Sequence, residues 1–292
     1  MIRIAGVIPA MATPLSNEGR SVHLGMLDRL CDFLIERQVT GLFVLGSTGE
    51  GALLSSDERK EVGTRVLEHV NGRVPIIINC GDVTTRGSID LALHARAAGA
   101  QAISVVFPYY YPISRSDAVN HFVTVAKAVP DMAVFVYYFG RSLLPDETLQ
   151  VRSEAPNVIG MKDGMGDYAL IQGHARVMGD SFTILEGSER LAYAALTMGA
   201  AGLISGVATA FPEPFVRIYD LLLRGQYAEA RREQDLICKL ADVIYDRNPW
   251  GRIKKALLLR GIDVGRPRGP IGECGDEETE QIRRSLGALG LV

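Results

Sequence analysis

Short apolar segments alternate with longer amphipathic segments about eight times along the chain. The apolar segments are rich in β-branched residues, and several have no polar alternation, as in the three isoleucines at 76–78. Such runs are typical of strands that are buried on both faces of a parallel sheet. The predicted strands cover residues 6–13, 41–47, 75–80, 102–107, 133–138, 158–162, 182–186 and 202–207.

Helical patterns separate these strands. Residues 21–37 carry leucines near helical spacing, and residues 55–70 open with Ser55, whose hydroxyl suits the unpaired amides of a first turn. Gly99 and Gly199 stand just before two predicted strands, where glycine commonly ends a helix. Eight strand–helix units without a long linker predict an α/β fold, a closed (β/α)8 TIM barrel. An open, doubly wound sheet is the alternative.

A helical extension follows the eighth unit. Helices are expected at 225–247, 249–260 and 276–289, with a loop rich in Gly and Pro at 265–275. No linker or low-complexity tract divides the sequence. We therefore expect the barrel at residues 1–224 and a C-terminal helical extension at 225–292, packed on the barrel in a single structural domain.

Composition narrows the class of protein. The 292 residues are 47% hydrophobic and 22% charged, and a net charge of -3 gives no basic surface for nucleic acid. The longest apolar run, at 200–211, is too short for a membrane span, and the apolar stretch at 4–14 fits a buried strand better than a signal peptide. Four scattered cysteines and five scattered histidines show no metal-binding spacing, so we expect a reduced, cytoplasmic protein.

One of the six lysines differs from the others in its position. Lys162 ends the apolar segment VIGMK, whereas the other five lie on predicted helices. Alternation puts Gly160 and Lys162 on one face, and Gly160 would leave room for the long side chain inside a barrel. A buried amine has a lowered pKa and becomes a neutral nucleophile. The alternative is a lysine that reaches from a strand end into solvent.

The loop after the second predicted strand reads GSTGE at residues 46–50. Its glycines permit a tight turn, and the hydroxyls of Ser47 and Thr48, with exposed amides, can hold a carboxylate without a cation. The alternative is an ordinary turn in which Glu50 starts or caps a helix.

Tyrosines follow two further strands. Three stand at 109–111, and Tyr137 and Tyr138 end the fifth strand. A tyrosine hydroxyl near an imine can transfer protons, although aromatic residues at strand ends more often only pack.

Three carboxylates also end predicted strands, namely Asp82, Asp163 and Glu186. Acidic strand ends can build a Mg²⁺ site, so a metal-dependent barrel enzyme is a competing hypothesis. Against it, alternation should direct Asp163 away from Lys162, and Asp167 suits the cap of the following helix.

Together these motifs make the chain resemble the dihydrodipicolinate synthase / N-acetylneuraminate lyase family over about residues 3–270. The matching segments are TP at 13–14, GSTGE at 46–50, PYY at 108–110, VIGMKD at 158–163, GLIS at 202–205 and the stretch 248–254. The resemblance implies a TIM barrel and a lyase of the class I aldolase type that acts on pyruvate or a related 2-oxo acid.

The resemblance also implies a role for each matched residue. Lys162 would form the Schiff base, Ser47 would belong to a proton relay, and Tyr137 would be the acid/base. Tyr110 would reach a neighbouring subunit's site in a homotetramer. The other expected substrate contacts are Thr48, Gly49, Ser205, Arg141 and Tyr138. The family needs no metal or organic cofactor.

The chain departs from the family after the fifth strand. Residues 137–140 read YYFG in place of the usual Tyr-Asn-x-Pro, and the loop is shorter. Tyr138 instead of Tyr137 could therefore match the acid/base. Arg141 would stand in for the arginine that binds the second substrate's carboxylate in the synthases. The departure weakens an assignment to lysine biosynthesis.

Three functions remain open at this point. The first is a lyase or synthase that forms or breaks a carbon–carbon bond of a 2-oxo acid, resembling 4-hydroxy-tetrahydrodipicolinate synthase, or an aldolase or dehydratase of 2-keto-3-deoxy sugar acids. The second is the metal-dependent barrel enzyme. The third is a non-catalytic barrel that senses an oxo acid. The expected partner is a small 2-oxo acid, with neither nucleic acid nor a membrane.

Overall fold

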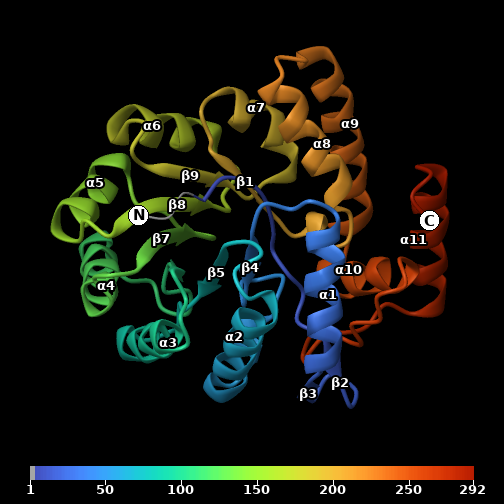
Figure 1. Cartoon of the computed structure of the whole chain (residues 1–292), viewed down its shortest axis with the longest axis horizontal. Helices are drawn as coiled ribbons and strands as arrows, with labels where there is room; N and C mark the ends of the chain where they lie inside the picture. Colours follow the sequence, from blue (N-terminus) through green and yellow to red (C-terminus); the bar gives the residue numbers. More distant parts are fainter. Residues whose placement is uncertain (1–3) are drawn as a thin grey trace.

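Eight parallel strands alternate with helices around a central barrel (Figure 1). The computed structural model describes residues 4–292, so the first three residues of the segment 1–224 lie outside it. The barrel strands are β1 (Gly6–Pro9), β4 (Leu42–Val44), β5 (Ile76–Asn79), β6 (Ala102–Val106), β7 (Ala133–Tyr138), β8 (Val158–Asp163), β9 (Thr183–Glu186) and β10 (Gly202–Ser205). Every strand falls on its predicted segment, and only β8 extends one residue beyond.

The sheet closes on itself. Its strand order is β1-β10-β9-β8-β7-β6-β5-β4, and the two end strands meet through a parallel bridge between Ala10 and Phe43. The Met11 amide donates to the Phe43 carbonyl across this seam at 2.9 Å. The closed-barrel prediction is confirmed. The open, doubly wound alternative is wrong, because that topology places the first strand inside the strand order.

Helices surround the barrel. They are α1 (Leu24–Glu36), α2 (Ser56–Val70), α3 (Thr85–Ala97), α4 (Arg115–Ala128), α5 (Pro145–Glu154), α6 (Tyr168–Met178), α7 (Ala192–Thr197) and α8 (Pro212–Leu223). Short 3-10 turns lie at η1 (Gly51–Leu53), η2 (Glu189–Leu191) and η3 (Val207–Thr209). The predicted caps are confirmed: the Ser55 hydroxyl accepts from the Glu58 amide, and the Asp167 carboxylate accepts from the Leu170 amide.

A short antiparallel hairpin precedes the first helix. Its strands are β2 (Leu15–Ser16) and β3 (Ser21–Val22), and β3 occupies the start of the helix expected at 21–37. Helix α1 begins after His23, whose ring nitrogen accepts from the Met26 amide. Strands of two residues are too short to leave a periodic pattern in the sequence.

The C-terminal extension consists of α9 (Tyr227–Ile244), α10 (Pro249–Leu259) and α11 (Asp276–Ala288), close to the predicted helices. Helix α9 packs along α8, and α10 contacts the η3 turn of the barrel. Figure 1 shows α10 and α11 together on one side of the barrel, in orange and red. The domain boundary at residue 224 remains a prediction. Within residues 4–292, no helix is long and apolar enough to cross a membrane.

Two apolar layers hold the barrel together. One lies between the strands and the surrounding helices, and the other fills the barrel. The interior layer includes Phe43, Phe135, Tyr137, Leu185 and Ile204. Because successive side chains of a strand point to opposite faces, each strand contributes to both layers.

Candidate active site

Lys162 faces the barrel interior near the end of β8. It aligns with Tyr137 on β7 and Leu185 on β9, which both belong to the interior layer. The side chain is 5% exposed, and its Nζ lies 4.1 Å from the ring centres of both Phe43 and Tyr137. The predicted interior position is thus confirmed, and the solvent-reaching alternative is wrong.

The room beside Gly160 has a different use from the one expected. A Cβ at this position would lie 2.6 Å from the ring of Phe135 and 2.4 Å from the carbonyl oxygen of Thr183. The absence of a side chain at Gly160 therefore leaves room for the Phe135 ring, one layer below the lysine. The expectation that Gly160 makes space for Lys162 is wrong in this respect.

Burial changes the chemistry of the Lys162 amine. Loss of hydration lowers its pKa from 10.5 to about 7, although the carboxylates of Glu189, Glu186 and Asp163 oppose the shift. A charged amine is costly to keep between two aromatic rings away from water. A substantial fraction of the amine is therefore neutral and nucleophilic near neutral pH.

The loop at residues 46–50 brings Ser47 and Thr48 to the same cavity as Lys162. Close packing against a side chain shapes this loop, since a Cβ on Gly46 would lie 2.3 Å from the ring of Phe43. Glu50 has a left-handed backbone, with a φ of 55°. Gly49, within the same loop, is held by the segment after β1, because its carbonyl accepts a hydrogen bond from the Thr13 hydroxyl at 2.6 Å.

The two tyrosines at the end of β7 point in opposite directions. Tyr137 lines the cavity, and its ring stands edge-on to Phe43 at 5.8 Å. Burial, and next the negative Asp163, raise the pKa of the Tyr137 phenol above its usual value. Tyr138 lies in the outer layer, where its hydroxyl bonds that of Thr148 at 2.6 Å. The expectation that Tyr138 contacts substrate does not fit this position, because strand alternation turns it toward the helices.

Three other expected contacts lie away from Lys162. Arg141 donates to the Ile113 carbonyl and stacks 4.9 Å from the ring centre of Phe107. The Ser205 hydroxyl is buried and donates to Glu189 at 2.7 Å. Tyr110 is 72% exposed on the loop after β6. Within the described part of the chain, none of these three borders the cavity around the lysine.

The three carboxylates of the metal hypothesis do not converge. Asp163 and Glu186 align on adjacent strands, on the face opposite to Lys162, whereas Asp82 follows β5 and faces Arg59 at 3.7 Å. Strands β5 and β8 are separated by two further strands. Among residues 4–292, no group of three His, Cys, Asp or Glu could hold a metal ion. The geometry does not support the metal hypothesis.

Two adjoining cavities open at the carboxyl ends of the strands. The cavity around Lys162 has a volume of about 390 Å³, and its neighbour has a volume of about 310 Å³. Ser47, Tyr137, Phe139 and Trp250 line both of them. The first cavity has the size of a small-molecule site and combines a neutral amine with hydroxyl groups.

A sequence model of the Dihydrodipicolinate synthetase family matches residues 3–289. The chain belongs to this family. It is 31% identical over 294 residues to a 4-hydroxy-tetrahydrodipicolinate synthase of Methanopyrus kandleri, covering 99% of this chain and 98% of that one. It is also 34% identical to an uncharacterized DapA-like lyase of Halobacterium salinarum, covering 98% and 94% of the two chains.

Solved structures agree with this assignment to the dihydrodipicolinate synthetase family. The prophage protein YagE of E. coli K12, in complex with pyruvate, superposes with a TM-score of 0.93 at 29% identity, covering 99% of both chains. Family membership and these relatives make the chain an enzyme, a lyase of the class I aldolase type.

Sequence reasoning missed one buried carboxylate in this family member. Glu189 is 5% exposed and lines the cavity around Lys162. Its Oε1 accepts from the hydroxyls of Ser205 and Tyr245 at 2.7 and 2.8 Å, and also from two backbone amides. These four donors fix the position of the carboxylate close to the lysine. No local signal identifies Glu189, because its donors come from distant elements.

Proposed function

We propose that this enzyme forms a Schiff base between Lys162 and the ketone carbon of pyruvate or a related 2-oxo acid. One observation carries the proposal. A buried amine with a pKa near 7 shares its cavity with two hydroxyl groups and a tyrosine. Family membership supports the same chemistry.

Each residue then has a distinct task. The neutral Lys162 nitrogen adds to the ketone carbon and gives up one proton, while the ketone oxygen takes one, to give a carbinolamine. A second proton transfer lets this oxygen leave as water, and an iminium remains on Nζ. Tyr137 carries these protons with help from Ser47. Thr48 and the backbone amides of residues 46–49 bind the substrate carboxylate.

The iminium is an electron sink for a carbon–carbon bond next to it. The overall reaction is an aldol condensation or cleavage, as the name of the Methanopyrus kandleri relative indicates for that protein. A specific observation favours a second candidate, an aldolase or dehydratase of 2-keto-3-deoxy sugar acids. Arg141, the expected ligand of a second carboxylate in the synthases, donates to the Ile113 carbonyl instead.

The proposal also includes the oligomeric state and the cellular location of the enzyme. We expect a homotetramer in which the exposed Tyr110 reaches the neighbouring subunit. We also expect a cytoplasmic location, which the free state of all four cysteines supports. The chemistry requires no metal or organic cofactor.

Reductive trapping tests the proposal. Borohydride added with pyruvate should fix a pyruvate-derived adduct on Lys162, which mass spectrometry of peptides locates. Lys162→Ala should fold normally, form no adduct and lose all turnover. Lys60→Ala, which changes a surface lysine paired with Asp90, should keep both. Retained turnover in Lys162→Ala would refute the assignment.

The same assay separates the remaining candidates. Pyruvate with aspartate semialdehyde tests the synthase, and deoxy sugar acids test the aldolase or dehydratase. Trapping without turnover on any of these compounds would favour the oxo-acid sensor.

A further inference from the structure

A buried ion pair connects the C-terminal extension to the loop at residues 46–50. The Nζ of Lys254 on α10 lies 2.8 Å from Oε1 of Glu50, and both side chains are almost fully buried. Breaking such a pair strands a charge without a partner inside the protein. The pair therefore restrains the loop strongly.

The Lys254 ammonium joins three segments of the chain. Besides its ion pair with Glu50, it donates to the Thr13 carbonyl at 3.0 Å and to the Arg266 carbonyl at 2.8 Å. The Thr13 hydroxyl in turn donates to the Gly49 carbonyl at 2.6 Å. The loop after β1, the loop after β4 and the C-terminal extension are thus linked at a single nitrogen.

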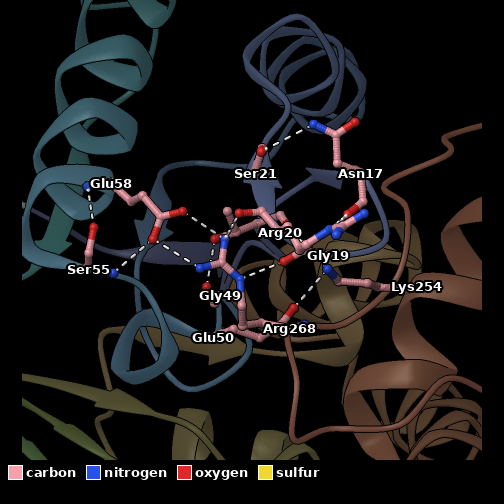
Figure 2. Close-up of polar contacts among 11 residues, drawn as sticks. Asn17, Gly19, Arg20, Ser21, Gly49, Glu50, Ser55, Glu58, Lys254 and Arg268 are labelled. Atoms are coloured by element: carbon pink, nitrogen blue, oxygen red, sulfur yellow. Dashed lines mark hydrogen bonds and ion pairs between the residues drawn. The ribbon is translucent and has the colours of Figure 1, made fainter.

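Residues beyond α10 hold the same carboxylate. The Arg268 amide donates to Glu50 at 2.5 Å, and its guanidinium binds Glu58 at 2.7 and 3.0 Å. It also donates to the Gly19 carbonyl at 2.6 Å. Figure 2 shows Arg268 between Glu50 and Glu58, with Lys254 approaching from the C-terminal helices.

A second contact from α10 reaches the loop at its substrate side. The indole nitrogen of Trp250, one helical turn before Lys254, donates to the Ser47 carbonyl at 2.8 Å. The Trp250 ring also lines both cavities. Helix α10 therefore contacts the loop near both of its ends, at Ser47 and at Glu50.

The loop needs this support because its conformation is strained. Glu50 and Leu45 both have left-handed backbones, with φ of 55° and 64°. Such a backbone is unfavourable for residues with side chains and persists where surrounding contacts enforce it. Without the contacts, the loop would relax and move the hydroxyls of Ser47 and Thr48.

We infer that Trp250 and Lys254 are positioning residues that hold the 46–50 loop in its carboxylate-binding shape. The inference rests on the proposed function, in which this loop binds the carboxylate of the 2-oxo acid. Neither residue takes part in bond making. Loss of either contact should weaken pyruvate binding and leave the reactivity of the bound molecule on Lys162 largely intact.

The test compares two variants with a matched control. Trp250→Phe removes the indole donor but keeps an aromatic ring, and Lys254→Met removes the ammonium. Arg260→Met removes a cation just after α10 that binds Ala210 and Glu213. The readout is borohydride trapping of pyruvate on Lys162, measured as the half-saturating pyruvate concentration and the maximal trapped fraction.

The two loop variants should raise the half-saturating concentration about three- to tenfold, the equivalent of one lost hydrogen bond. The maximal trapped fraction should stay near that of the wild type. Arg260→Met should leave the half-saturating concentration unchanged even if it lowers the melting temperature. Unchanged values in both loop variants, or an equal shift in the control, would overturn the inference.

A double variant separates positioning from folding. Glu50→Gln combined with Lys254→Met removes both buried charges, so it should recover stability lost by Lys254→Met alone. Its half-saturating concentration should remain raised, because the contact between Lys254 and the loop is still absent. Recovery of pyruvate binding together with stability would mean that the pair acts on folding alone.

Fluorescence distinguishes failure of the inference from failure of the proposed function. The chain has one tryptophan, so its emission reports the Trp250 contact without any substrate. Lys254→Met should shift the emission to longer wavelength, and Arg260→Met should not. If wild-type protein is not trapped by pyruvate yet the shift is seen, the proposed function fails while the link between helix and loop stands. An unshifted emission argues against that link.

Discussion

The proposed chemistry of this molecule depends on a single amine. Lys162 lies between the rings of Phe43 and Tyr137, and burial is the largest influence on its pKa. The same burial that makes the amine reactive also makes it costly for the fold. Below its ordinary pKa, the unfolded chain binds a proton that the folded protein binds only near pH 7 and below.

Lys162→Met should therefore stabilise the protein at neutral pH. Methionine has a similar length and fills the site without charge. Between about pH 7 and 10.5, the unfolded wild type holds more protons than the folded form, so wild-type stability rises with pH in this range. We expect the variant to exceed the wild type by roughly 3–5 kcal/mol near pH 7, with the difference vanishing toward pH 10. Urea unfolding at several pH values measures it, and a pH-independent difference would contradict the explanation.

Strand alternation decides which side chain of an element can act. On β7, Tyr137 enters the cavity, whereas Tyr138 joins a buried chain of hydroxyl and imidazole groups through Thr148 and His174. The family resemblance left both tyrosines open, and the register of one strand resolves their placement. The two phenols lie next to each other in sequence but in different layers of the fold.

Matched substitutions on β7 should separate these tyrosines. Tyr137→Phe is expected to keep the stability of the protein but to lower turnover by about 10²–10⁴-fold, because the proposed proton carrier is lost. Tyr138→Phe breaks its bond to Thr148 and should cost about 1 kcal/mol of unfolding free energy with little change in turnover. Steady-state kinetics and thermal unfolding measure both. The opposite pattern would transfer the acid/base role to Tyr138.

The sequence was most informative where periodicity extends over a whole element. Eight strands and the helical extension were predicted within a few residues, and so was the interior position of Lys162. Glu189 and the Phe135 ring beside Gly160 were not foreseen, because their neighbours come from separate elements. The β2–β3 hairpin was not predicted, because its strands are only two residues long.

At the scale of the whole molecule, the barrel has one lightly bonded seam. Strands β1 and β4 meet through the bridge between Ala10 and Phe43, whereas β7 and β8 pair along their length. The Thr40 hydroxyl adds bonds to the carbonyls of Ala5 and Val7 at 2.7 and 3.1 Å across this seam. Since Phe43 also contacts the lysine amine, the seam lies close to Lys162.

Thr40→Val should weaken the seam, because it keeps the side-chain shape and removes the hydroxyl. We expect a loss of about 0.5–1.5 kcal/mol in unfolding free energy. Thr124→Val is the control, since the Thr124 hydroxyl bonds the Asn120 carbonyl within α4. Denaturant unfolding compares the two variants. An equal loss of unfolding free energy in both variants would show that the hydrogen bonds at the seam contribute no more to stability than one within a helix.

The link between Glu50 and the C-terminal segment has a consequence for how the protein is made. The partners of this carboxylate, Lys254 and Arg268, lie more than 200 residues further along the chain. A nascent chain on the ribosome can pair its early strands long before these residues emerge from the exit tunnel. We therefore expect the loop at residues 46–50 to reach its final conformation only as synthesis finishes, and a product cut short before residue 254 lacks the contacts that hold it.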